Sequence, residues 1–141
     1  MIQLKSKREL EKMREAGRHV GEILQRLGEL AKPGVTTAEL DRVAHAEIRA
    51  RKLESSFLGY APGDNPPFPA VICASVNEEI VHGIPGGRRL VEGDLLKIDF
   101  GAICDGFHAD AAITVPIGEV DEESRRLVST TLSSLYAGVE Q

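Results

Sequence analysis

Two residues, Asp105 and Gly106, constrain the fold of this chain more than any others, because they separate two long runs of strand-forming residues. An Asp-Gly pair between such runs is a strong signal for a two-residue β-hairpin turn. The sequence therefore predicts antiparallel strands over 95–104 and 107–116. If these two residues alone form the turn, Cys104 pairs with Phe107, and that pair fixes the register of the rest.

This register places two aspartates on one face of the hairpin. Asp110 lies opposite Gly101, and Asp99 lies two residues before Gly101 on the same strand face. Such diagonal neighbours are about 7–8 Å apart at Cα, so their carboxylates can reach a common point. Mid-strand carboxylates are costly unless they pair or bind metal, and oxygen ligands suit hard or borderline divalent ions. The other interpretation is a solvated sheet face, or an aspartate bonded to a lysine or the backbone.

The opposite face of the hairpin carries only apolar or small residues, and the sequence predicts that this face is core. Its members are Phe100, Ala102, Cys104, Phe107, Ala109, Ala111 and Ile113. His108 falls on the carboxylate face if the hairpin is regular, where it is a further candidate ligand or an orienting group.

Helix signals flank the hairpin. Ser6 with Glu9, and Thr36 with Glu39, form capping boxes, and each is followed by apolar residues at spacings of three and four. Asp121 is a plausible N-cap for a third helix. These patterns predict one helix from Ser6 to Lys32, a second ending near Lys52, and a third after Asp121.

Between the second helix and the hairpin, residues 54–69 hold four of the seven prolines and are predicted to form a loop. Residues 70–76 (AVICASV) are predicted to form a buried strand. The order of elements indicates an α+β fold, in which an antiparallel sheet is covered on one face by helices.

Composition excludes several classes of protein. The 141 residues suffice for one domain, and 42% hydrophobic with 28% charged residues is typical of globular chains. No apolar run approaches the roughly 20 residues of a membrane span, and the N-terminus lacks a signal-peptide pattern. Cys73 and Cys104 are the only cysteines, so a disulfide scaffold is excluded and a cytoplasmic location is predicted.

Charge is unevenly distributed. The net charge is −5, yet residues 1–20 contain six basic side chains against three acidic ones. A basic N-terminal helix could contact RNA or the surface of a ribosome. The alternative is a solvated helix face, which is the more common origin of such a charge run. No specific nucleic-acid partner is predicted.

His82 and Cys73 are two further candidate site residues. His82 lies in a loop that reads HGIP, and loops often carry chemistry, although a single loop histidine is more often structural or solvent-exposed. Cys73 has no recognisable His–Asp partner nearby, which favours a buried structural thiol over a nucleophile.

Three segments, SVNEEIVHGIP, GDLLKIDFGA and DGFHADAAITV, together resemble the N-terminal half of the type I methionine aminopeptidases. The resemblance extends over essentially the whole chain. It implies half of a pita-bread fold, in which two pseudo-symmetric α+β halves surround a dinuclear metal site. It also implies removal of the initiator methionine from the N-termini of nascent polypeptides, in a domain of which residues 1–141 are the N-terminal half.

The resemblance implies a role for each candidate residue. Asp110 would bridge two divalent metal ions and Asp99 would chelate one, with Co, Mn, Fe, Zn and Ni all compatible. His82 would contact substrate and act in catalysis as a hydrogen-bond donor. Tyr60, Phe68 and Cys73 would line the pocket for the methionine side chain, and His108 is not a ligand in that family. The segment between Tyr60 and Ala70 is longer than is usual there.

The same resemblance implies that this chain is incomplete as an enzyme. The family's other metal ligands, one histidine and two glutamates, lie in a C-terminal half that follows the segment matched here, and so does a second catalytic histidine. The 141-residue chain alone is therefore predicted to be inactive. The alternatives are a non-catalytic protein-binding module of the same fold, a related prolidase, and a half-fold that associates with itself.

Overall fold

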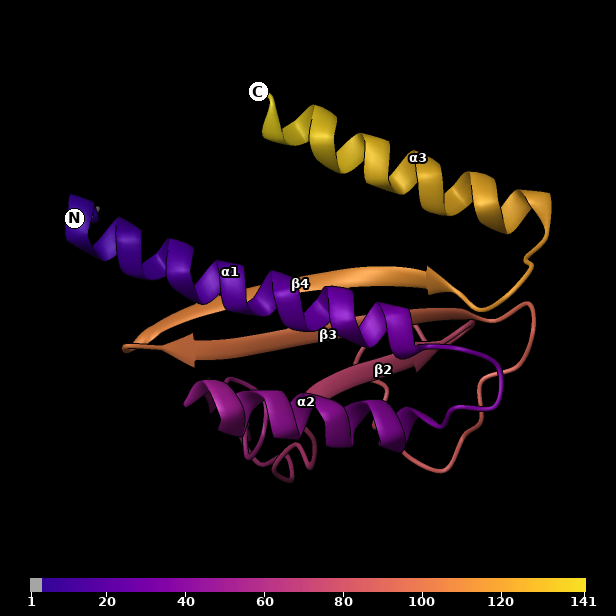
Figure 1. Cartoon of the computed structure of the whole chain (residues 1–141), viewed down its shortest axis with the longest axis horizontal. Coiled ribbons are helices and arrows are strands. Elements are labelled where there is room, and N and C mark those ends of the chain that lie inside the picture. Colours follow the sequence, from indigo (N-terminus) through magenta and orange to yellow (C-terminus); the bar gives the residue numbers. More distant parts are fainter. Residues whose placement is uncertain (1–3) are drawn as a thin grey trace.

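The structure, a computed structural model, describes residues 4–141 and is an α+β fold (Figure 1). Its elements, in chain order, are α1 (Lys7–Leu30), α2 (Thr37–Arg51), β1 (Glu54–Ser55), β2 (Ile72–Val76), β3 (Leu95–Cys104), β4 (Phe107–Pro116) and α3 (Glu122–Val139). The predicted fold class and the predicted order of the main elements are confirmed.

Strand β3 is the centre of an antiparallel sheet. It pairs with β4 along its whole length, from Leu95 opposite Pro116 to Cys104 opposite Phe107. Both turn residues have positive φ, 50° at Asp105 and 81° at Gly106, as a type I′ turn requires. The predicted register is therefore confirmed. β1 and β2 pair with successive parts of β3 along the edge that β4 leaves free.

The first two helices begin where the capping boxes predict. Ser6 N–H donates to the Glu9 carboxylate over 2.7 Å, and Glu9 N–H donates to the Ser6 hydroxyl. Thr36 and Glu39 make the same reciprocal pair. The second helix ends at Arg51, next to the predicted Lys52, which is its C-cap and takes a left-handed conformation at φ 56°.

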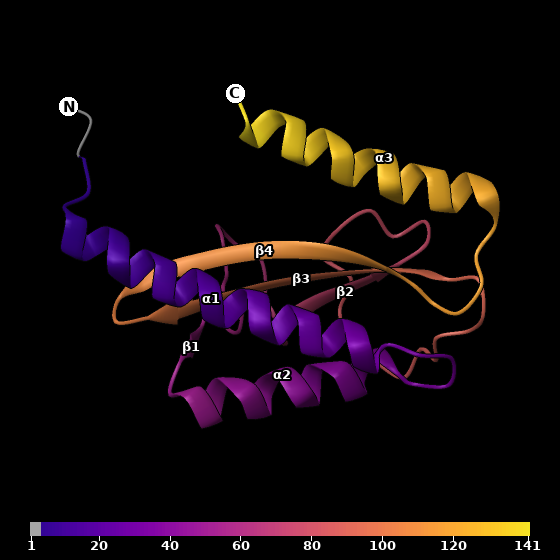
Figure 2. The ribbon, with the colours of Figure 1, turned by 45° about the horizontal axis from the view of Figure 1, so that its top comes forward.

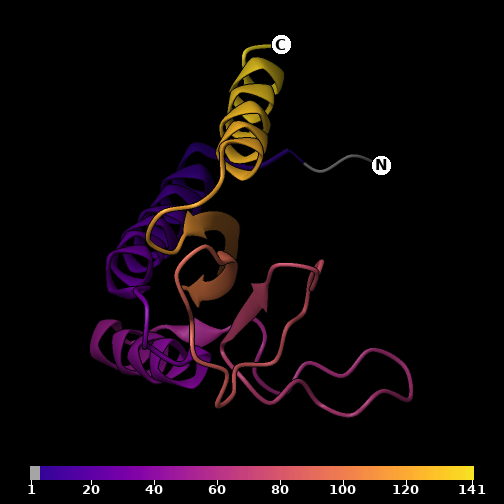
Figure 3. The same ribbon diagram turned by 90° about the vertical axis from the view of Figure 1, so that its right-hand side faces the viewer.

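The molecule is layered. Helices α1 and α2 lie on one side of the sheet, and the loops that follow β1 and β2 lie on the other (Figures 2 and 3). The core lies between the helices and the sheet, where Ile23, Leu27, Ile98 and Phe100 are fully buried. The second face of the sheet, which carries the aspartates, is therefore turned toward the loops.

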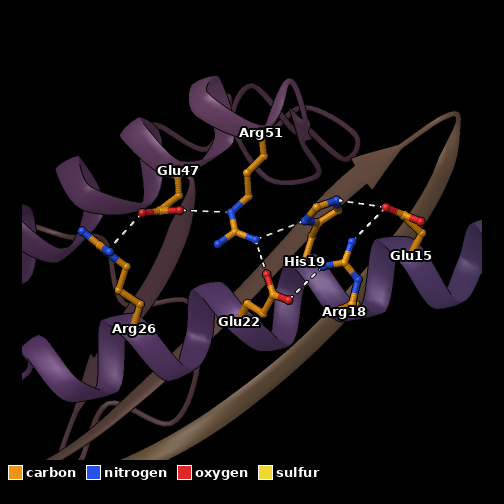
Figure 4. Close-up of polar contacts among 7 residues, drawn as sticks. All are labelled: Glu15, Arg18, His19, Glu22, Arg26, Glu47 and Arg51. Atoms are coloured by element: carbon orange, nitrogen blue, oxygen red, sulfur yellow. Dashed lines mark hydrogen bonds and ion pairs between the residues drawn. The ribbon is translucent and has the colours of Figure 1, made fainter.

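A polar network joins α1 to α2 at the edge of this core (Figure 4). Arg51 is its centre: it donates to Glu47 over 3.0 Å, to Glu22, and to Nδ1 of His19 over 3.2 Å. Arg26 extends the network from Glu47, and Arg18 joins Glu22 to Glu15. Arg51 and Glu47 are partly buried, whereas the pairs made by Arg18 are exposed and contribute only about 0–1 kcal/mol each.

Two details differ from the sequence predictions. The predicted loop over 54–69 begins with strand β1, and the strand predicted from residue 70 begins at Ile72. The amides of Val71 and Ile72 instead donate to the Asp41 carboxylate of α2, over 2.9 and 3.3 Å. These long-range contacts have no local sequence signal.

The prediction of a core along the whole helix-side face of the hairpin is confirmed only in part. Phe100 and Ala102 are buried, and Cys104, Ala109 and Ile113 are partly buried and pack against the core. Phe107 is only partly buried and Ala111 is exposed, so the prediction is wrong at Ala111. β4 pairs with β3 alone, and α3, which follows it, is set apart from the sheet (Figure 1).

Helix α3 buries none of its residues. Its apolar side is exposed at Leu127, Leu132, Leu135, Tyr136 and Val139. Over residues 4–141, no helix is both long enough and apolar enough to cross a membrane.

Candidate active site

The β3–β4 hairpin positions Asp99 and Asp110 on its loop-side face. Gly101 pairs with Asp110, and Asp99 pairs with Ala112, so both aspartates lie on the face opposite to that of Phe100 and Ala111. The prediction that the two carboxylates share one face is confirmed. The reason is local: an unbulged two-residue hairpin leaves no other register.

These aspartates open into a cleft of about 620 Å³ between the hairpin and the loops. All six residues singled out as the site line this cleft: Tyr60, Phe68, Cys73, His82, Asp99 and Asp110. Its other lining residues are Ser56, Phe57, Pro62, Asn65, Pro66, Ile84 and His108. Four separate segments of the chain therefore meet at the carboxylates.

The charged form of the Asp99 carboxylate is destabilised by its surroundings when no cation is bound. Its Oδ1 atom is buried and has no hydrogen-bond partner within the part of the chain that the structure describes. Burial raises the pKa of this carboxyl, and the nearby charge of Asp110 raises it further, while His82 and the Phe100 amide act in the opposite direction. A bound cation would remove both penalties, so this pair of residues fits a divalent metal ion.

The two aspartates are not a complete metal site. Within residues 4–141, no group of three or more His, Cys, Asp and Glu side chains is placed to hold a metal ion. His108 lies on the carboxylate face, as the register predicts, but its Nδ1 is 3.0 Å from the Ser56 hydroxyl. Two carboxylates alone would leave most of the coordination of a metal ion to other groups.

His82 reaches the cleft through a tight loop against β2. Its backbone is left-handed, with φ of 59°, which is uncommon for a residue with a side chain. Gly83, the next residue, donates from its amide to the Ser75 hydroxyl over 2.9 Å, and its carbonyl accepts from Ala74. A Cβ at Gly83 would lie 2.5 Å from the Ala74 carbonyl oxygen, so only glycine permits this approach.

Cys73 lies on β2 directly opposite Asp99. Burial raises the pKa of its thiol to about 11, and the charges of Asp99 and Asp110 add to the shift. Because the thiolate is the reactive form, this cysteine is a poor nucleophile at neutral pH. The structure favours the interpretation of Cys73 as part of the pocket wall.

An apolar wall stands beside the carboxylates. Phe57 and Phe68 meet edge to face, with ring centroids 6.4 Å apart. Phe68 was identified by resemblance, whereas Phe57 and Ser56 were not identified from the sequence. Both lie in a segment without periodicity, and only the pairing of β1 with β3 brings them to the cleft.

The geometry can be compared with known proteins. The model of metallopeptidase family M24 matches residues 11–141. The chain belongs to that family. Methionine aminopeptidase from Clostridium acetobutylicum is 48% identical over 142 aligned residues, and methionine aminopeptidase 1 from Bacillus subtilis is 44% identical over 141. Each alignment covers 100% of this chain and 55% of the relative.

Solved structures agree. The crystal structure of methionine aminopeptidase from Thermotoga maritima superposes with a TM-score of 0.90 at 33% identity, over 97% of this chain and 53% of that one. The fold is thus half of a pita-bread fold, and the resemblance to the N-terminal half of type I methionine aminopeptidases is confirmed. The chain spans about half the length of the relatives that it matches.

Proposed function

We propose that residues 1–141 form the N-terminal half of the catalytic domain of a metal-dependent methionine aminopeptidase. The activity would be removal of the initiator methionine from nascent polypeptides. The observation that carries the proposal is the meeting of Asp99, Asp110, His82 and the apolar wall in one cleft. The names of relatives that are up to 48% identical support the same activity.

Asp99 and Asp110 are the residues that would hold two divalent ions, of which Co, Mn, Fe, Zn and Ni all suit oxygen ligands of this kind. Bound ions of this type lower the pKa of a water molecule and polarise the scissile carbonyl. The unpaired Oδ1 of Asp99 supports its role as a ligand. With only two carboxylates, the chain alone would bind metal weakly and would not hydrolyse methionyl peptides.

His82 would donate a hydrogen bond to the carbonyl oxygen of the substrate as negative charge develops there. Its exposed side chain and its position on the cleft support this role. One well-placed donor of this type contributes about 3–4 kcal/mol to the stabilisation of a transition state. Phe68, Cys73 and Tyr60 would enclose the methionine side chain, whose unbranched thioether suits an apolar pocket with aromatic walls.

The setting of such an enzyme follows from its substrate. Nascent N-termini are met at the ribosome in the cytoplasm, and both cysteines of the chain are free thiols, as a reducing compartment requires. The basic residues at the start of α1 are mostly exposed and are the candidates for ribosome proximity.

The second candidate is a non-catalytic or self-associating half-fold. The exposed apolar side of α3 favours it, because contiguous apolar surface of this kind marks contact sites. In that case Asp99 and Asp110 would have no effect on function, which separates the two candidates.

A chimera tests the proposal. Residues 1–141 are joined to the part of Bacillus subtilis methionine aminopeptidase 1 that follows the matched segment, and Met-Gly peptides are assayed with Co²⁺. We expect cobalt-dependent release of methionine, abolished by Asp99→Asn and Asp110→Asn and unchanged by Asp105→Asn at the hairpin turn. His82→Ala should slow turnover about 10²–10³-fold with the metal content unchanged.

The same assay on the 141-residue chain alone should show no turnover. A folded chimera that is inactive with Co, Mn, Fe, Zn and Ni in turn, or that tolerates Asp99→Asn and Asp110→Asn, would reject the proposed function. Turnover by the 141-residue chain at the rate of the chimera would show that no further half is needed.

A further inference from the structure

Gly101 occupies the middle of β3, directly opposite Asp110. It is buried, and its φ is not among the positive values found at six other glycines of the described chain. Its backbone conformation is therefore open to any residue. The need for glycine at this position must come from the space that a side chain would fill.

That space is already taken by the site. A Cβ at Gly101 would lie 2.9 Å from Oδ2 of Asp110, 2.9 Å from Cε1 of Phe57 and 3.0 Å from Cβ of Ser56. Non-bonded carbon atoms prefer separations of about 3.5–4.0 Å, so at least one of these groups would have to move. A carboxylate of the proposed metal site and an aromatic wall of the cleft thus share the space above one glycine.

The wall cannot retreat easily. The Ser56 amide donates to the Gly101 carbonyl over 3.1 Å, and the Ser56 hydroxyl lies 3.0 Å from Nδ1 of His108. The ring of Phe57 is also in edge-to-face contact with Phe68. Asp110 is the least constrained of the groups, because its side chain is exposed.

We propose that Gly101 is a positioning residue of the site, whose missing side chain sets the place of the Asp110 carboxylate against the Phe57 ring. The inference rests on the proposed function only for the role of Asp110 toward metal. A methyl group at position 101 rotates the Asp110 carboxylate away from the point that it shares with Asp99. A smaller side chain at position 57 leaves room for that methyl group and relieves the displacement.

The test uses the 141-residue chain with Co²⁺ alone as the probe. The variants are Gly101→Ala, Phe57→Ala, the double variant, and Gly87→Ala, a control glycine at which a Cβ would meet nothing within 4 Å. Gly101→Ala should weaken Co²⁺ binding by about 10-fold or more, as is typical when a group supporting a ligand is changed. The double variant should regain part of this loss relative to Phe57→Ala, while the metal-free melting temperature shifts little.

Equal Co²⁺ affinity in Gly101→Ala and Gly87→Ala would overturn the inference. So would a loss that Phe57→Ala does not relieve, because the shared space would then have no role. If the unmodified chain binds Co²⁺ too weakly to be measured, as two carboxylates alone allow, NMR of the metal-free chain decides the placement. Unchanged Asp110 χ1 couplings and unchanged contacts from residue 101 to the Phe57 ring in Gly101→Ala would then overturn it.

Discussion

The β3–β4 hairpin has two faces that come from the same two strands and differ completely in their surroundings. The helix side carries Phe100, which is fully buried under α1, and the loop side carries Asp99 and Asp110 beside a cleft. Side chains alternate between the faces at every residue, so one face can be selected for packing and the other for chemistry. The hairpin is stabilised through one face, and a charged, partly unsatisfied cluster is held on the other.

The largest change in the free energy of unfolding is expected for a substitution on the helix side of the hairpin. Phe100→Ala should lower the free energy of unfolding by about 3–5 kcal/mol, because it empties a fully buried site at the centre of the core. Thr114→Ala, an exposed position on the loop side of the same hairpin, should change it by less than about 0.5 kcal/mol. Urea denaturation of both variants measures the difference, and equal effects would contradict the assignment of the two faces.

The next effect compares the helix that covers the hairpin with the helix that does not. Leu27→Ala on α1 should lower the free energy of unfolding by about 2–5 kcal/mol, because Leu27 is fully buried. Leu135 on α3 is 61% exposed, and Leu135→Ala should cost less than about 0.5 kcal/mol. Thermal unfolding of the two variants tests this. A large cost at Leu135 would mean that α3 packs against something in solution, such as a second copy of the chain.

The smallest change in the free energy of unfolding is expected on the loop side, where a substitution should stabilise the protein. The pKa of Asp99 is raised, so between its ordinary value of 3.8 and its folded value the native protein binds more protons than the unfolded chain. Stability therefore falls as pH rises through that window, and the penalty is fully present above it. Without metal, Asp99→Asn should raise stability at pH 7 by less than about 3 kcal/mol, because it removes a partly buried charge and the repulsion from Asp110.

This advantage of Asp99→Asn should disappear as the pH falls below 3.8, where both states are protonated. Melting temperatures in a chelator across this pH range measure it, with Asp64→Asn in the exposed loop as the control. An advantage that persists at low pH would show that the charge of Asp99 is not the cause.

The sequence by itself determined the elements that depend on short-range signals. The Asp105-Gly106 turn specified the inner ends of β3 and β4, the register, and the shared face of Asp99 and Asp110. The capping boxes specified the starts of α1 and α2. These features follow from turn geometry, alternation and hydrogen bonds three residues apart, all of which can be read within one short window.

Tertiary structure alone decided what stands on each face. The start of β2 depends on Asp41, about thirty residues earlier, and the wall of Ser56 and Phe57 depends on the pairing of β1 with β3. The requirement for glycine at position 101 and the exposure of α3 depend equally on groups far away in the chain. Helices α1 and α3 each have an apolar side in sequence. Burial of that side depends on a partner surface, and only the folded chain shows whether one is present.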